Sequence, residues 1–218
     1  MDWEAFLVSI KLATATTLLL LPLAVYLARW LALTDFAFKG AIEALVTLPL
    51  VLPPTVIGYY LLVLFAQQGL IGGWFSAWFG TSLAFSFNGL LLASILVNLP
   101  FAVQPAQRSF EAIPRDVRQS ALCCGLSPWQ TFRKIELPLA RNGVLGAVLL
   151  TFTHTLGEFG VVLMVGGNIA GETRTLSIAI FDQVEAFNEN AAAIMSLSML
   201  AFSVFIMSCM FLLTYRRK

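Results

Sequence analysis

The chain has 218 residues, of which 59% are hydrophobic and only 11% are charged, with a formal net charge of +1. So few charges cannot solvate the surface of an ordinary globular domain, and the near-neutral balance argues against a nucleic-acid-binding surface. The mean hydropathy of +0.85 predicts an all-α protein that crosses a lipid bilayer several times.

Five apolar runs have about the 20 residues that a helix needs to cross a bilayer. The first follows Asp2 and Glu4 instead of basic residues and is too long for a cleavable signal, so we expect it to remain as a membrane helix. The five predicted crossings cover residues 5–29, 42–66, 83–107, 139–165 and 191–214.

Lys and Arg side chains favour the cytoplasmic side of a membrane protein. If residues 108–138 lie in the cytoplasm, five crossings leave only Lys11 and Arg174, of 13 basic residues, on the outer side. This distribution predicts that the N-terminus lies outside and the C-terminus inside. Tyr215 and the basic residues 216–218 are expected to anchor the last helix at the bilayer interface.

The polar segment 108–138 carries signals for the start and end of helices. Pro114 suits the first turn of a helix, because its missing N–H is not needed there. Gly125 is expected to end that helix, because glycine readily takes the positive φ of a helix terminus. The segment is therefore predicted to be structured, and it forms a candidate docking surface.

A second short helix is expected directly after this turn. Ser127 is a good N-cap, Pro128 suits the first helical position, and Gln130 can complete a capping box. We expect this second helix to stop before Pro138, because proline interrupts a regular α-helix.

The second apolar run contains Pro53, Pro54 and Gly58, which are unusual in a plain membrane anchor. Irregular backbone at membrane depth persists only where it borders protein or a water-filled cavity. We interpret these residues as a hinge or helix start that lines a translocation path. The alternative is a simple entry turn, with Pro54 as the first residue of a helix.

The fourth apolar run carries Thr151, His154, Thr155 and Glu158, whose spacing places them on one face of a helix. An acid inside a membrane helix is costly, which makes Glu158 a candidate functional residue. The stripe is interpreted as a hydrogen-bonded strut between helices or as the lining of a hydrated path. Two residues without a third ligand do not make a metal site, so none is predicted.

Two shorter segments are expected on the extracytoplasmic side. Residues 67–82 place Trp74 and Trp78 on one helical face, which predicts a short helix lying in the plane of the bilayer interface. Residues 172–188 are too short to span and predict a partial helix, acting either as a gate or as a simple cap.

The sequence contains no phosphate-binding G-x-x-x-x-G-K-[ST] loop, nucleophile elbow or dinucleotide fingerprint. We therefore expect no enzymatic activity and no cofactor in this chain, and predict a transport subunit driven by another chain. The alternatives are a proton-coupled secondary carrier using His154 and Glu158, or a structural membrane subunit of a respiratory assembly.

The spacing Gln119-Ser120-Ala121, three residues, Gly125, nine residues, Ile135-Glu136-Leu137-Pro138 resembles the EAA signature of type I ABC importer permeases. Gln119 and Ser120 replace the usual Glu and first Ala. In that family the motif forms a coupling helix that sits in a groove on an ATPase subunit. The resemblance implies an ATPase-docking set of Gln119, Ser120, Ala121, Gly125, Leu126, Ser127, Trp129, Ile135, Leu137 and Pro138.

Two further stretches are similar to molybdate importer permeases, with sulfate and tungstate permeases looking alike here. They are Leu48–Leu62 and the sequence Leu156-Gly157-Glu158-Phe159-Gly160 with the following residues 168–176. The resemblance implies a bacterial or archaeal plasma (inner) membrane protein that pairs with a second copy of itself. It also implies two ATPase chains, which bind ATP and Mg²⁺, and an extracytoplasmic solute-binding protein.

Overall fold

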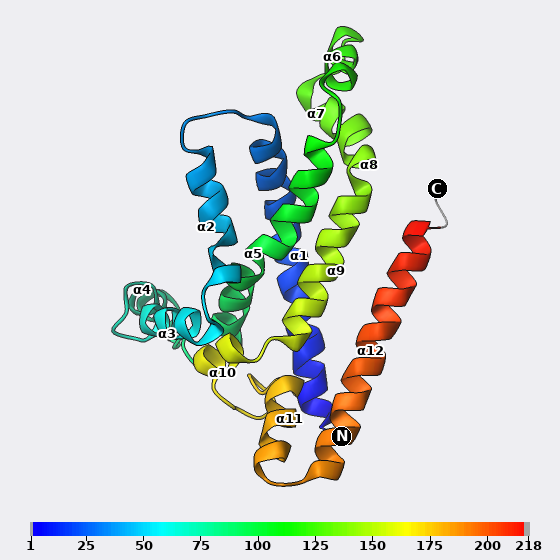
Figure 1. Cartoon of the computed structure of the whole chain (residues 1–218). Coiled ribbons are helices and arrows are strands. Elements are labelled where there is room, and N and C mark those ends of the chain that lie inside the picture. Colours follow the sequence, from blue (N-terminus) through cyan, green and yellow to red (C-terminus); the bar gives the residue numbers. More distant parts are fainter. Residues whose placement is uncertain (1, 216–218) are drawn as a thin grey trace.

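The structure is a computed structural model that describes residues 2–215, a range that is helical and contains no strand. Three helices are continuous, apolar and long enough to cross a membrane: α1 (Trp3–Leu33), α5 (Phe87–Glu111) and the Glu189–Ser208 part of α12 (Glu189–Tyr215). α1, α5 and α9 (Arg141–Gly157) pack side by side as the central bundle (Figure 1). The predicted all-α, polytopic fold is confirmed.

Small side chains fill the centre of this bundle and let the three helices approach closely. Ala24 and Ala28 of α1 and Ala102 and Ala106 of α5 are fully buried in one cluster. Gly143 of α9 lies so close to α5 that an added Cβ atom would stand 2.4 Å from the Pro105 carbonyl oxygen. The contact between α5 and α9 therefore depends on the absence of a side chain at this position.

The second apolar run is not one straight helix. α2 (Lys39–Val51) and α3 (Pro54–Phe65) meet at 109°, and Pro54 is the first residue of α3, as its sequence position predicts. α3 packs on α10 (Gly160–Gly166), where Gly58 lies against Met164. The irregularity expected from the prolines is confirmed, and it turns α3 away from the direction of α2.

The fourth apolar run is also broken, so the prediction of one helix over 139–165 is wrong. α9 ends at Gly157, Glu158 is extended at φ −66° and ψ 131°, and α10 begins at Gly160. The Glu158 carboxylate accepts a hydrogen bond from the Val161 N–H at the start of α10. Because the carboxylate satisfies an N–H group that has no partner in α10, it compensates for the break.

Segment 108–138 begins as the end of α5 and continues into α6 (Arg115–Cys123) and α7 (Pro128–Thr131). Gly125 has φ +82°, and Ser127 forms a capping box with Gln130, so both predicted helix signals are confirmed.

The predicted stop before Pro138 is wrong. The chain continues from α7 through a π-helix, η1 (Phe132–Glu136), into α8 (Leu137–Leu139). The Leu137 N–H bonds to the Phe132 carbonyl five residues earlier. Because this turn is wider than an α-turn, it relieves the clash that proline causes with the carbonyl four residues before it.

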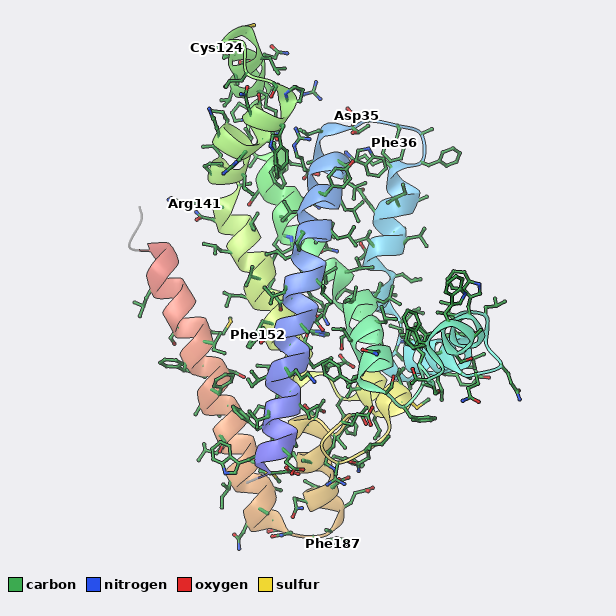
Figure 2. The ribbon with its side chains drawn as sticks, turned by 180° about the vertical axis from the view of Figure 1, so that it is seen from behind. Asp35, Phe36, Cys124, Arg141, Phe152 and Phe187 are labelled. Carbon is green, nitrogen blue, oxygen red and sulfur yellow. The ribbon has the colours of Figure 1, made fainter. Side chains whose placement is uncertain are left out.

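The remaining short helices lie away from α6 and α7. α4 (Leu70–Phe79) occupies the segment predicted as an in-plane helix, and its Trp74 and Trp78 are exposed. Within residues 172–188 the helix is α11 (Leu176–Glu185), which packs on α12. Residues 216–218, predicted as a basic anchor, lie outside the described residues. Figure 2 shows Cys124, after α6, at one end of the molecule and Phe187, after α11, at the other.

We predict that Gly143→Ala lowers the free energy of unfolding by about 1–3 kcal/mol, because the new methyl group forces α5 and α9 apart. Thermal unfolding of the purified chain in mild detergent measures the effect. Gly146→Ala is the matched control on the same helix, since its added Cβ would lie 3.8 Å from Pro105, an ordinary contact. Equal stability of the two variants would contradict the close approach.

Candidate coupling and translocation site

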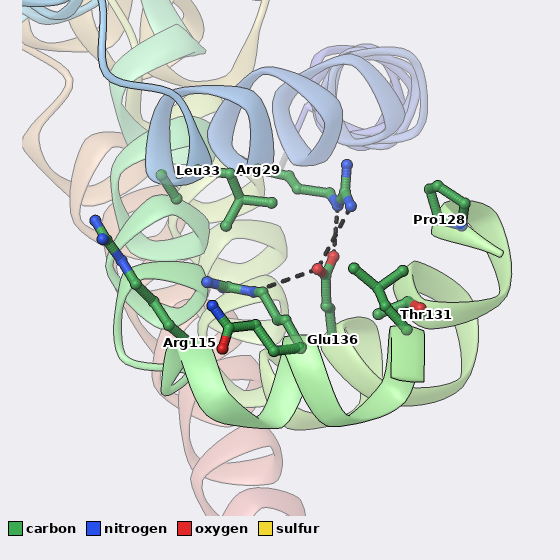
Figure 3. A pocket seen from close by; sticks show the side chains of 10 residues that line it. Arg29, Leu33, Arg115, Pro128, Thr131 and Glu136 are labelled. Atoms are coloured by element: carbon green, nitrogen blue, oxygen red, sulfur yellow. Dashed lines mark hydrogen bonds and ion pairs between the residues drawn. The ribbon is translucent and has the colours of Figure 1, made fainter. Parts of the chain in front are cut away.

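A buried carboxylate connects segment 108–138 to the central bundle (Figure 3). Glu136 of η1 is 2% exposed and lies between Arg29 of α1 and Arg118 of α6. Arg29 Nε donates to Glu136 Oε2 at 2.5 Å, and Arg118 Nε lies 3.3 Å from Oε1. A buried carboxylate is costly unless it is paired, so these contacts hold η1 against both helices.

Arg118 also contacts the end of α5. Its Nη2 donates to the Phe110 carbonyl at the end of α5, at 2.5 Å. Burial lowers the pKa of Arg118, and Arg29 acts in the same direction, while Glu136 opposes the shift. The guanidinium stays charged because the ordinary pKa of arginine is far above 7. α1, α5, α6 and η1 therefore meet at one ionic cluster.

The predicted docking residues do not form a single patch. Gln119 lines a pocket of about 340 Å³ between α1 and α6, whereas Trp129 and Leu137 line an adjoining apolar groove beside α1. Gly125 and Ser127 form the exposed turn between α6 and α7. The others are divided by burial: Ser120 and Pro138 are exposed, Ile135 and Leu126 are half-buried, and Ala121 is buried.

The ionic cluster was missed by reading the sequence. Its signal is present, because Glu136 is a lone acid inside the apolar sequence Ile135-Glu136-Leu137-Pro138. Its partners lie 107 and 18 residues earlier in the chain at Arg29 and Arg118, and only the packing of α1 against η1 shows which cations it meets.

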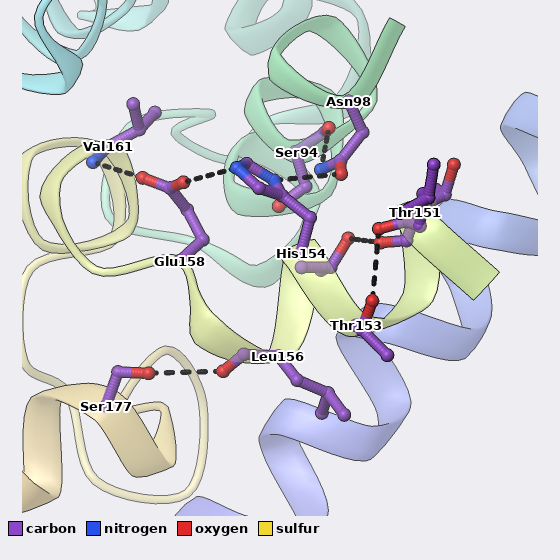
Figure 4. A network of polar contacts seen from close by, with 11 residues as sticks. Ser94, Asn98, Thr151, Thr153, His154, Leu156, Glu158, Val161 and Ser177 are labelled. Carbon is purple, nitrogen blue, oxygen red and sulfur yellow. Dashed lines mark hydrogen bonds and ion pairs between the residues drawn. The ribbon is translucent and has the colours of Figure 1, made fainter. Parts of the chain in front are cut away.

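A polar network lies where α5 meets the break after α9 (Figure 4). His154 Nδ1 is 3.1 Å from Asn98 Oδ1, and His154 Nε2 is 3.8 Å from Glu158 Oε2. Asn98 also donates to the Ser94 carbonyl, and the His154 ring stacks on Phe101 at 3.9 Å. The imidazole therefore bridges α5 to the start of α10.

The predicted polar stripe is only partly on one helix. Thr151, His154 and Thr155 belong to α9, and Thr151 and Thr155 are buried. Glu158 lies beyond the end of α9 and reaches His154 from the extended segment. The prediction that all four residues lie on one helical face is wrong, because α9 ends at Gly157, before Glu158.

The two chain breaks lie against each other. A Cβ atom added to Gly160, at the start of α10, would stand 2.7 Å from Pro54 Cβ at the start of α3. A Cβ atom added to Gly58 would likewise stand 2.7 Å from the Cβ atom of Met164. Pro54 and Gly58, predicted from the second apolar run to line the path, therefore contact α10, which follows the break after α9. Pro53, the third residue predicted there, directly precedes α3. No group of three metal-ligating side chains occurs among the described residues.

The family model for the inner membrane component of binding-protein-dependent transport systems matches residues 21–218. The chain belongs to this family and is a multi-pass inner membrane permease of the ABC-importer type.

Among its relatives, the molybdenum transport system permease protein ModB of Azotobacter vinelandii is 46% identical over 96% of this chain and 93% of that protein. ModB of Escherichia coli K12 is 35% identical over 84% of this chain and 80% of that protein. The E. coli sulfate transport system permease protein CysT is 33% identical over 83% of this chain and 65% of the CysT chain.

The fold is also found in a solved structure. A bacterial alginate ABC transporter, in complex with an alginate pentasaccharide-bound periplasmic protein, matches with a TM-score of 0.71 over 96% of this chain and 75% of that chain. At 15% identity the match shows the shared fold. The family model and the ModB relatives confirm the resemblance to ABC importer permeases that was inferred from the sequence.

We predict that Glu136→Gln lowers the free energy of unfolding by about 3 kcal/mol, because it leaves two inward-facing guanidinium groups without their counter-charge. Denaturation of the purified chain in detergent measures this loss. Glu111→Gln is the control, since that side chain is 30% exposed and pairs with the exposed Arg108. A loss of stability no larger than that of the control would show that the cluster contributes little.

Proposed function

We propose that the chain forms the translocation path of an ABC importer for molybdate. The observation that carries this proposal is the 46% identity to a molybdenum permease over 96% of the chain, against 33% for a sulfate permease. A transporter for sulfate or tungstate is the alternative within the same class. The complete importer would contain two copies of this chain, two ATPase chains that bind ATP and Mg²⁺, and an extracytoplasmic solute-binding protein.

We propose that the end carrying α6 and α7 faces the cytoplasm. Arg115, Arg118, Arg133 and Lys134 belong to this end, and basic side chains favour the cytoplasmic face. Because α1 runs from the opposite end, this orientation places the N-terminus outside, and α12 returns the C-terminus to the inside (Figure 1).

Docking on the ATPase would use the exposed turn between α6 and α7. Ser127 and Gly125 fix the shape of this turn through the capping box and the positive φ. ATP-driven displacement of the turn would pass through the Glu136 cluster to α1, and through α8 to α9. The broken segments at Pro54 and Glu158 are the points at which the path would open and close.

The polar groups beside the breaks suit weak binding of a tetrahedral oxyanion. Asn98, His154 and the threonines of α9 offer amide, imidazole and hydroxyl groups, whereas tight recognition of an oxyanion usually employs arginine. Selectivity would then reside in the solute-binding protein. Measured micromolar affinity of the isolated permease for molybdate would contradict this division of labour.

The alternative from the sequence, a proton-coupled carrier, would use His154 and Glu158, which approach each other to 3.8 Å, but the family membership favours the ABC importer. Such a carrier would transport without an ATPase partner and would stop when a protonophore dissipates the proton gradient. The ABC importer requires ATP and is insensitive to the protonophore, so the same uptake assay separates the two.

We predict that Gly125→Val abolishes ATP-driven molybdate uptake while the chain still folds. A β-branched residue at φ +82° is strained by about 1–2 kcal/mol, which distorts the docking turn without a steric clash. Uptake is measured in proteoliposomes containing the permease, its ATPase and the binding protein.

Gly80→Val is the matched control for this experiment. Gly80 has φ +67° and is equally open, but it follows α4, far from the docking turn. It is expected to retain uptake. If Gly125→Val transports normally, or if both variants lose transport equally, the role of the turn in coupling is wrong.

A further inference from the structure

An apolar groove of about 610 Å³ lies between α1 and the chain that leads from α7 into α9. Leu21 and Val25 of α1 form one wall, and Phe132 and Val144 form the other. Tyr26 and Trp129 line the same groove and are 70% and 66% exposed. Exposed Tyr and Trp side chains are typical of the boundary between bilayer and water, so the groove lies at that level.

A basic pocket adjoins this groove. Arg29 and Pro128 line the 340 Å³ pocket between α1 and α6 (Figure 3). Both residues also line the groove, so the two cavities share a wall. Arg115 and Arg118 line the pocket as well, which sets three guanidinium groups against the single carboxylate of Glu136.

The pocket contains one hydroxyl group without a hydrogen-bond partner and one weakly paired guanidinium group. The Thr131 hydroxyl is buried, with the residue 3% exposed, and it has no hydrogen-bond partner in the described structure. Arg115 is 85% exposed, and the acid that it reaches among residues 2–215 is Asp35, which is 84% exposed and 3.8 Å away. A surface ion pair of this kind contributes little, so Arg115 can readily turn to another anion.

An apolar groove joined to a basic pocket at the membrane boundary has the two recognition features of an anionic phospholipid. We propose that the chain binds one such lipid, with an acyl chain in the groove and its phosphate among Arg29, Arg115 and Thr131. Basic pockets beside membrane helices are known to hold anionic headgroups. Free inorganic phosphate would use only the pocket, and a second copy of the chain would cover the groove without headgroup selectivity.

The bound lipid would act beside the Glu136 cluster. Arg29 already contacts Glu136 and stands 5.2 Å from the Phe132 ring, so a phosphate bound to it would add a further connection between α1 and η1. This inference concerns lipid binding alone, and it does not depend on the substrate that is transported.

The test is native mass spectrometry of the full chain purified in mild detergent and mixed with phosphatidylglycerol or phosphatidylcholine. We expect selective retention of phosphatidylglycerol. Arg115→Gln should lower that retention about fivefold, the factor equivalent to about 1 kcal/mol for one basic residue near anionic headgroups. Arg108→Gln is the matched control, because Arg108 is 83% exposed and also pairs with an acid, but it does not line the pocket. It should leave retention unchanged.

A second pair of variants tests the groove. Val144→Trp fills it and should lower retention of phosphatidylglycerol by a similar factor, whereas Leu150→Trp, at a 40% exposed position further along α9, should not. Melting temperatures of the four variants confirm that each is folded.

Three outcomes would overturn the proposal. The first is equal retention of the two lipids. The second is displacement of phosphatidylglycerol by millimolar inorganic phosphate together with normal retention in Val144→Trp, which would identify a site for free phosphate. The third is efficient disulfide cross-linking of two copies through Tyr26→Cys, with no lipid retained, which would make the groove an interface between copies.

Discussion

The pairing of Glu136 with Arg29 and Arg118 is the interaction on which the placement of segment 108–138 depends. α6 packs mainly on α7 and η1, and its Val117 contacts the apolar core of the bundle. The ionic cluster adds polar connections by tying η1 to α1 and α6, and Arg118 adds a bond to the end of α5. A segment held in this way can transmit a displacement to two membrane helices, α1 and α5, at once.

A second constraint acts at membrane depth, where every backbone polar group needs a partner inside the protein. The break after α9 meets this need because Glu158 caps α10 and contacts His154, which in turn contacts Asn98. The break before α3 is placed directly against it, with Pro54 beside Gly160. The Glu158 side of this contact is buried, whereas Pro53 and Pro54 are exposed, and the two breaks adjoin each other between the more regular helices.

Turn and cap residues in the sequence were sufficient to predict the turn between α6 and α7, but not the path of the chain at Pro138. Gly125 and the Ser127 capping box were predictable because their conformations depend only on neighbouring residues. The stop at Pro138 was predicted wrongly, because a π-turn can absorb a proline that an α-helix cannot. The direction of α3 and the partners of Glu136 could not be predicted, since both depend on helices distant in sequence. The Arg29 contact, for example, joins residues 107 positions apart.

The cytoplasmic location of the turn between α6 and α7, and its contact with an ATPase, is the central claim. Cys123 and Cys124 are exposed at this turn and serve as natural reporters. Labelling of a Cys209→Ser chain with a membrane-impermeant maleimide should occur in inside-out vesicles and not in right-side-out vesicles. Addition of the ATPase should protect both thiols. Labelling from the outer side, or no protection by a bound ATPase, would contradict the claim.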